Sequence, residues 1–138
     1  MAQGLLLDTC ALIWIANGDR IGDAAGEAIR QAEAGGEPLF ISPISAWEIA
    51  TLSARGRLRL TTSPETWFAR IMETPSAQLA ELTVTVLMRS AFLPGAPPAD
   101  PADRIIIATA REHGHAIVTR DHYILAYAGE GLVSALPC

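Results

Sequence analysis

Short segments that are apolar at every position alternate with longer segments of helical character, and this alternation constrains the fold of the chain most. We expect buried strands at residues 4–8, 39–41 and 116–119, because apolar residues occupy consecutive positions there. Strands of this kind, separated by helices, are typical of a mostly parallel sheet that helices cover on both faces. The sequence therefore predicts the α/β class.

Helix signals separate these strands. Asn17-Gly18, Gly35-Gly36 and Gly114 end apolar helical stretches, and Ser42-Pro43 is a typical helix start. The predicted helices lie at residues 9–16, 23–34, 43 to 53 or 54, 64–72, 84–92 and 101–113. We further expect a short apolar segment near 79–82 and a long loop at 94–98. A weak helix and then a final strand over 132–135 are expected to finish the chain. With 138 residues, the chain is predicted to form a single domain over residues 1–138.

Charge and cysteine content exclude several classes of protein. All 10 basic residues are arginine, so a phosphate-binding loop ending in Gly-Lys and a Schiff-base lysine are both absent. The 15 acidic residues give a net charge of -5, so binding to nucleic acid requires cations or a local basic patch. Two cysteines, Cys10 and Cys138, favour a reducing cytoplasmic setting. The N-terminal apolar run, interrupted by Asp8, is too short for a membrane span and lacks a basic leader.

Four acidic residues are predicted to meet at one edge of the sheet. Asp8 closes the first strand and Asp121 follows strand 116–119, and the carboxyl ends of parallel strands form the usual ligand crevice. Glu48 lies within the helix after the second strand, and Asp103 lies in the first turn of its helix. Because clustered carboxylates repel one another and hard cations prefer oxygen ligands, the sequence predicts a site for one or two Mg²⁺ or Mn²⁺ ions.

Each acid also has a structural interpretation. Asp8 and Asp121 suit helix N-caps, and Asp103 would stabilise a helix dipole beside an N-cap at Asp100. Glu48 could complete a capping box that begins at Ser45. Two other functions remain open on these residues: a phosphatase with Asp8 as nucleophile, although Cys10 stands where a second Asp is usual, and a binding module without catalysis.

Four segments, taken in order, carry a family resemblance. Leu6-Leu7-Asp8-Thr9, Ser45-Ala46-Trp47-Glu48-Ile49-Ala50, the run from Asp100 to Ala110, and Val118-Thr119-Arg120-Asp121 resemble PIN-domain nucleases, in particular VapC-like toxins. The resemblance implies a three-layer α/β/α fold with a central sheet of about four to five strands. It places the catalytic, metal-binding roles on Asp8, Glu48, Asp103 and Asp121, with Thr9 and Thr119 supporting them by hydrogen bonds. Cys10 departs from the His that close relatives often carry, and we assign it no chemistry.

The resemblance also implies an activity and partners. It points to a Mg²⁺-dependent endoribonuclease of a bacterial toxin–antitoxin pair, in which an activated water cleaves RNA to leave 5′-phosphate and 3′-hydroxyl ends, inhibiting translation or growth. A VapB-like antitoxin and a homodimer are expected, with residues 11–16 and 44–52 as possible subunit contacts.

Other candidate residues carry weaker signals. Arg55, Arg57 and Arg59 could form a basic edge for RNA, or a solvated helix end. We interpret the tryptophans, Trp14, Trp47 and Trp67, mainly as core or dimer contacts rather than base-stacking surfaces. His113 and His115 flank Gly114 and are interpreted as connector residues, because no zinc signature surrounds them.

Overall fold

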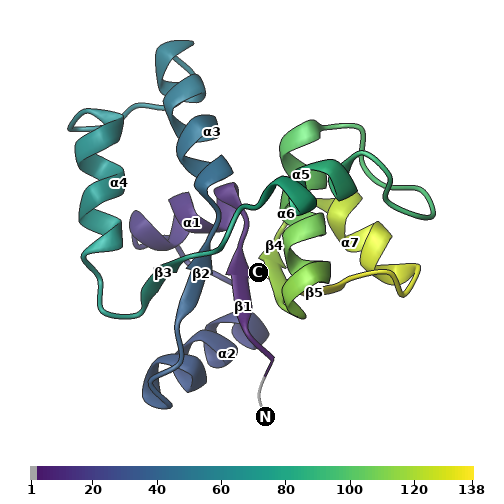
Figure 1. Cartoon of the computed structure of the whole chain (residues 1–138). Helices are drawn as coiled ribbons and strands as arrows, with labels where there is room; N and C mark the ends of the chain where they lie inside the picture. Colours follow the sequence, from purple (N-terminus) through teal and green to yellow (C-terminus); the bar gives the residue numbers. More distant parts are fainter. Residues whose placement is uncertain (1–2) are drawn as a thin grey trace.

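A computed structural model, which describes residues 3–138, shows a five-stranded sheet at the centre of the molecule (Figure 1). Its strands run parallel in the order β3-β2-β1-β4-β5. Their bounds are β1 Leu5–Leu7, β2 Leu39–Ile41, β3 Ala77–Leu79, β4 Ala116–Thr119 and β5 Ser134–Pro137. Leu6 of the central strand pairs in register with Phe40 on one side and Ile117 on the other. The predicted α/β class with a mostly parallel sheet is confirmed.

Helices cover both faces of this sheet. They are α1 Thr9–Ala16, α2 Asp23–Ala34, α3 Pro43–Ala54, α4 Pro64–Met72, α5 Val84–Ser90, α6 Pro101–His113 and α7 His122–Gly129. Leu5 and Leu7 point into a core shared with α1 to α4, whereas Leu6 points into a second core shared with α6 and α7. Figure 1 shows α3 and α4 on one side of the sheet and α5 to α7 on the other. The buried strands are apolar throughout because successive side chains alternate between two cores.

Three predicted boundaries are wrong. The helix expected over 84–92 ends at Ser90, because Ala91 and Phe92 donate backbone hydrogen bonds to Met88 and Arg89 in a tight turn. The apolar segment expected near 79–82 is strand β3 over Ala77–Leu79, and the last strand covers Ser134–Pro137 rather than 132–135. Both strands are sheet edges with exposed positions, so their apolar pattern is weak. Within residues 3–138, no helix is both long and apolar enough to cross a membrane.

Candidate active site

The ends of β1 and β4 bring Asp8 and Asp121 to the same edge of the sheet, as neighbouring parallel strands require. Glu48 reaches this edge from α3, and Asp103 reaches it from the first turn of α6. Cys10, on the first turn of α1, lies close enough to all four acids for their negative charges to act on its thiol. Burial, and then the negative charges of the acids, raise the pKa of its thiol to about 11; the contributing acids are Asp8, Glu48, Asp103 and Asp121. The structure therefore gathers the four acids around one surface.

Asp8 is both a helix cap and a member of this cluster. Its Oδ1 accepts a hydrogen bond of 2.7 Å from the backbone N–H of Ala11, so it caps α1. Its Oδ2 accepts a hydrogen bond from the hydroxyl of Thr119. The residue is only 4% exposed, and this burial raises the pKa of Asp8 although both hydrogen bonds oppose the rise. Capping therefore does not exclude a role in the site.

Thr119 connects the two strand ends. While its hydroxyl donates to Asp8, its oxygen accepts a hydrogen bond of 3.0 Å from the backbone N–H of Asp121. Asp121 in turn caps α7, and its Oδ1 accepts from the N–H groups of Tyr123 and Ile124 at 2.8 and 3.1 Å. One buried threonine thus connects the Asp8 carboxylate, which follows β1, to the backbone of Asp121, which follows β4.

Thr9 makes the corresponding hydrogen bond to Glu48. Its hydroxyl donates to Oε1 of Glu48 and lies 2.9 Å from the hydroxyl of Ser45. The capping-box interpretation of Glu48 is wrong, because Ser42 caps α3 through a bond of 3.1 Å from the N–H of Ile44. Burial raises the pKa of Glu48, with smaller contributions from nearby carboxylates.

Asp100 is a fifth acidic residue at this edge, and the sequence analysis assigned it only a capping role. It does cap α6, accepting a hydrogen bond of 2.8 Å from the N–H of Ala102. Burial raises the pKa of Asp103 to about 7, and Asp100 contributes the largest charge effect, ahead of Asp121 and Glu48. The signal was present in the sequence: Asp100 and Asp103 stand three residues apart, the spacing at which side chains of a helix are neighbours.

The donor set suits a hard divalent cation. Its oxygens are carboxylates, and the pKa values of Asp8, Glu48 and Asp103 are raised first by burial and then by the negative charges of neighbouring acids, which a cation would offset. Within residues 3–138, no three His, Cys, Asp or Glu side chains are already arranged as a set of metal ligands. Asp8 and Glu48 instead accept hydrogen bonds from threonines. A cation at this site would compete with these hydrogen bonds for the carboxylate oxygens.

Arg104, which the sequence analysis did not single out, shapes the loop before Asp100. Its guanidinium donates to the backbone carbonyls of Ser90, Pro98 and Ala91 at 3.0, 3.1 and 3.2 Å. This one side chain ties the end of α5 and the loop to the start of α6. It therefore holds the segment that presents the Asp100 and Asp103 carboxylates.

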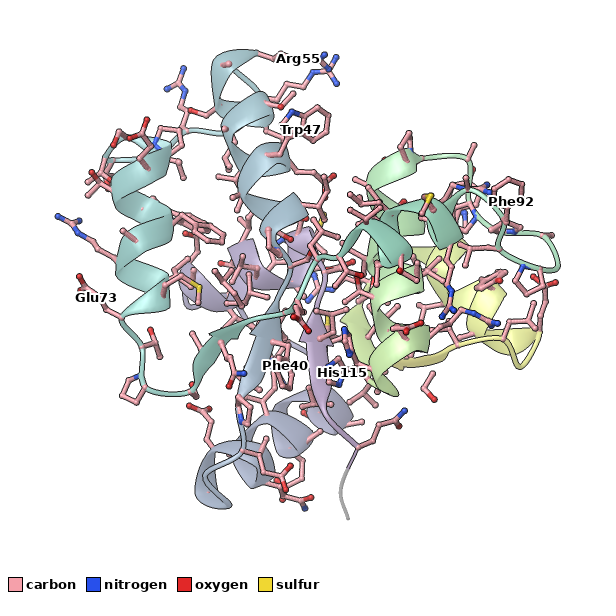
Figure 2. The ribbon with its side chains drawn as sticks, viewed as in Figure 1. Phe40, Trp47, Arg55, Glu73, Phe92 and His115 are labelled. Carbon is pink, nitrogen blue, oxygen red and sulfur yellow. The ribbon has the colours of Figure 1, made fainter. Side chains whose placement is uncertain are left out.

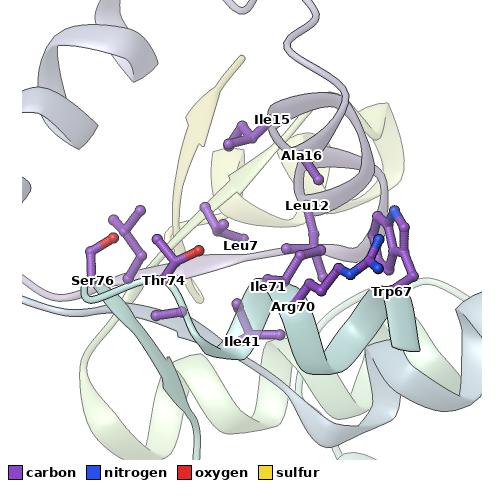
Figure 3. Close-up of a pocket in the computed structure, with 12 residues that line it drawn as sticks. Leu7, Leu12, Ile15, Ala16, Ile41, Trp67, Arg70, Ile71, Thr74 and Ser76 are labelled. Atoms are coloured by element: carbon purple, nitrogen blue, oxygen red, sulfur yellow. The ribbon is translucent and has the colours of Figure 1, made fainter. Parts of the chain in front are cut away.

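The three tryptophans have different surroundings. Trp67 packs against the core and lines an apolar cavity of about 450 Å³ between α1, α4 and the sheet, which none of the five acids lines (Figure 3). Trp14 lies under the guanidinium of Arg120, 3.9 Å from the ring centroid. Trp47 is 61% exposed, so the core interpretation is wrong for this residue. Figure 2 shows it on α3, with Arg55 farther along the same helix.

The remaining candidates lie away from the acids or have structural surroundings. Arg55, Arg57 and Arg59 are all exposed, at and after the C-terminal end of α3. His115 stacks on Phe40 with ring centroids 4.3 Å apart, in the connection between α6 and β4. Its place agrees with a connector role.

Comparisons with known proteins identify relatives of the chain. The PIN domain family matches residues 5–130. Ribonuclease VapC22 from Mycobacterium tuberculosis is 34% identical over 124 residues, 89% of this chain and 91% of that protein. The crystal structure of VapBC2 from Rickettsia felis bound to a DNA fragment from their promoter has a TM-score of 0.69 at 12% identity, and covers 97% of this chain and 98% of that chain. A toxin–antitoxin complex from Klebsiella pneumoniae has a TM-score of 0.55 at 23% identity, and covers 86% of this chain and 87% of that chain. Both solved structures share the fold.

Proposed function

Because the chain belongs to the PIN-domain family, we propose that it is a metal-dependent endoribonuclease that acts as the toxin of a bacterial toxin–antitoxin pair. The observation that carries the proposal is the gathering of Asp8, Glu48, Asp103 and Asp121 at the carboxyl edge of the sheet. A relative that is 34% identical over most of its length is named a ribonuclease, which supports RNA as the substrate. The match over residues 5–130 supports a single PIN domain over the whole chain.

The four carboxylates would hold Mg²⁺, with Mn²⁺ as a substitute, and their oxygens match the preference of these ions. When bound, such an ion neutralises charge that develops on the scissile phosphate and activates water for in-line attack. Thr119 orients Asp8, and Thr9 orients Glu48. Glu48, whose pKa is raised by burial, would orient or deprotonate the attacking water. Attack by external water on the phosphorus, with the P–O3′ bond breaking and the 3′-oxygen leaving and taking up a proton, would give 5′-phosphate and 3′-hydroxyl ends.

A direct test is cleavage of structured RNA by the purified protein with Mg²⁺ and with EDTA. Asp8→Asn and Asp103→Asn are the site variants, and Asp19→Asn, at an exposed position outside the acidic cluster, is the matched control. We expect Mg²⁺-dependent cutting by the wild type and the control, and none by folded site variants. Equal cutting by all variants, or products with cyclic 2′,3′-phosphate ends, would contradict the proposed mechanism. Folded protein that binds RNA without cutting it would instead support the binding-module alternative.

We also infer a VapB-like antitoxin as partner and a cytoplasmic location. The similar structure from Klebsiella pneumoniae is itself a toxin–antitoxin complex, although its identity of 23% shows only a common fold. A net charge of -5 and a surface of carboxylates favour a partner that carries basic side chains. Co-expression with a VapB-like protein and purification of a complex tests this inference: a stable complex that weakens when basic side chains of the partner are made neutral supports it, and the absence of any complex contradicts it.

We also propose that two copies of the chain form a homodimer. Of the contacts expected from the sequence, Ala11 and Leu12 are buried in the chain's own core and are unavailable to a second copy. The exposed apolar side chains of α5, Val84, Leu87 and Met88, offer a better surface. Light scattering at micromolar concentration tests the dimer, and a monomer at that concentration would remove it.

A further inference from the structure

Trp47 is a large aromatic side chain that the fold leaves in solvent on α3, the helix that also carries Glu48. It is 61% exposed, whereas Ser45 and Ile49 on the same helix are buried. It directly precedes Glu48, whose carboxylate belongs to the acidic cluster. A tryptophan on the surface presents a large, flat aromatic face that a ligand can cover.

Trp47 shares its face of α3 with a cation. Trp47, Thr51 and Arg55 follow one another at intervals of four residues, which places them along one side of the helix. Figure 2 shows Trp47 and Arg55 on the side of α3 toward α5 and α6 in that view. The eight residue steps from Trp47 to Arg55 span about 12 Å along the helix axis, a length that a few nucleotides of extended strand can cover. Arg57, also exposed, continues the positive charge beyond the helix end.

We propose that this face of α3 is a track for single-stranded RNA, in which Trp47 stacks on a base near the scissile phosphate and Arg55 contacts a phosphate farther along the strand. This inference rests on the proposed ribonuclease function and specifies how the substrate is held. The chain carries a net charge of -5, and beyond the phosphate at the cation site the RNA needs contacts that offset this charge. Stacking is such a contact, because every base has a π-face and the contact needs no charge.

Unpaired nucleotides fit the track better than a duplex. A base can stack on a protein side chain only after it leaves its own stack, which single-stranded loops and ends allow. The expected substrate is therefore RNA with an unpaired segment at the cleavage point. Trp47 would act on binding and position, while the carboxylates carry out the chemistry.

The test measures binding and cleavage separately. Fluorescein-labelled, random-sequence single-stranded RNA is titrated with Trp47→Ala, Trp47→Phe and wild type, and cleavage of the same RNA is followed with Mg²⁺. We expect Trp47→Ala to weaken binding about tenfold, the order of one base–aromatic stack, and to raise KM with little change in kcat. Trp47→Phe should recover most of the affinity. Phe92→Ala, which removes an aromatic that is 86% exposed, is the matched control and should bind like wild type.

The outcomes separate this inference from the proposed function. If the wild type neither binds nor cuts RNA, the proposed function fails. If the wild type cuts RNA and Trp47→Ala binds it equally well, the track alone is overturned. Light scattering of each variant decides the remaining alternative. If Trp47→Ala converts a dimer into monomers, Trp47 is a subunit contact, and the proposal is likewise overturned.

Discussion

Ionisation of Asp103 should be measurable as a loss of folded-state stability. Burial, together with the charges of Asp100 and Asp121, raises the pKa of this carboxyl from 3.8 to about 7. Because the pKa is higher in the folded than in the unfolded chain, stability is lost as the pH rises through about 7 and is fully present only below about 4. The rise in pKa from 3.8 to about 7 corresponds to a loss of about 4 kcal/mol in the free energy of unfolding above pH 7. Screening by solvent at this partly exposed site reduces the loss to about 2 kcal/mol.

Asp103→Asn removes this cost, so the metal-free variant should be more stable than the wild type. At pH 8 in EDTA we expect its Tm to rise by about 8 °C, from about 4 °C per kcal/mol for a chain of this size. At pH 5 the gain should fall to less than half, because Asp103 of the folded wild type is then protonated. Under the proposed function the ionised cluster binds Mg²⁺, so Mg²⁺ should stabilise the wild type more than the variant.

Thermal unfolding followed by circular dichroism measures these differences, with Asp19→Asn as the exposed control that should leave Tm unchanged. If Asp103→Asn melts no higher than the wild type at pH 8 in EDTA, ionised Asp103 does not destabilise the folded chain. If the same difference persists at pH 5, the effect is unrelated to ionisation, and the reasoning is likewise refuted.

Further predictions concern other side chains around the site. Thr119→Val should lower the free energy of unfolding in urea by about 1–3 kcal/mol and slow RNA cleavage, because Asp8 and the backbone of Asp121 lose the hydroxyl that both contact. Thr119→Ser should restore both the stability and the cleavage rate. Arg104→Leu should lower the free energy of unfolding by about 3 kcal/mol and speed amide hydrogen exchange in residues 91–100, because three backbone carbonyls lose their donor. Unchanged exchange in residues 91–100 would contradict this role of Arg104. Iodoacetamide should alkylate Cys10 about 100-fold more slowly at neutral pH than a thiol of pKa 9.0, and Mg²⁺ should accelerate the reaction; mass spectrometry of the labelled peptide decides.

The elements with strong local signals were predictable from the sequence. The helix α2 over Asp23–Ala34 ends before a Gly-Gly pair, and α3 begins after Ser42 with proline at its first position, as expected. The central strands were predictable because burial on two faces demands apolar residues at every position. The edge strands β3 and β5 were misplaced, since their residues face solvent on several sides and carry no clear pattern.

The surroundings of the candidate site were less predictable. That Thr119 would bridge Asp8 and Asp121 followed only generally from the sequence, since the bond to Asp8 joins residues 111 positions apart. The exposure of Trp47 was missed because α3 carries apolar residues on most of its sides, so its sequence does not indicate which side faces solvent. These features depend on how helices dock, which local sequence does not determine.

Three of the five acids at this edge, Asp8, Asp100 and Asp121, cap helices with one carboxylate oxygen. Their negative charge is thus partly balanced by the N-terminal ends of α1, α6 and α7, which lowers the cost of gathering acids before any cation arrives. This dual use dictates the choice of variant. Asn caps a helix about as well as Asp but carries no charge, whereas Ala removes both functions at a cost of about 1 kcal/mol. Asp8→Asn and Asp121→Asn should therefore lose cation-dependent stabilisation while the helices remain capped. If instead each Asn variant is destabilised as much as the matching Ala variant, the carboxylate charge itself holds the helix, and the separation of capping from cation binding argued here is wrong.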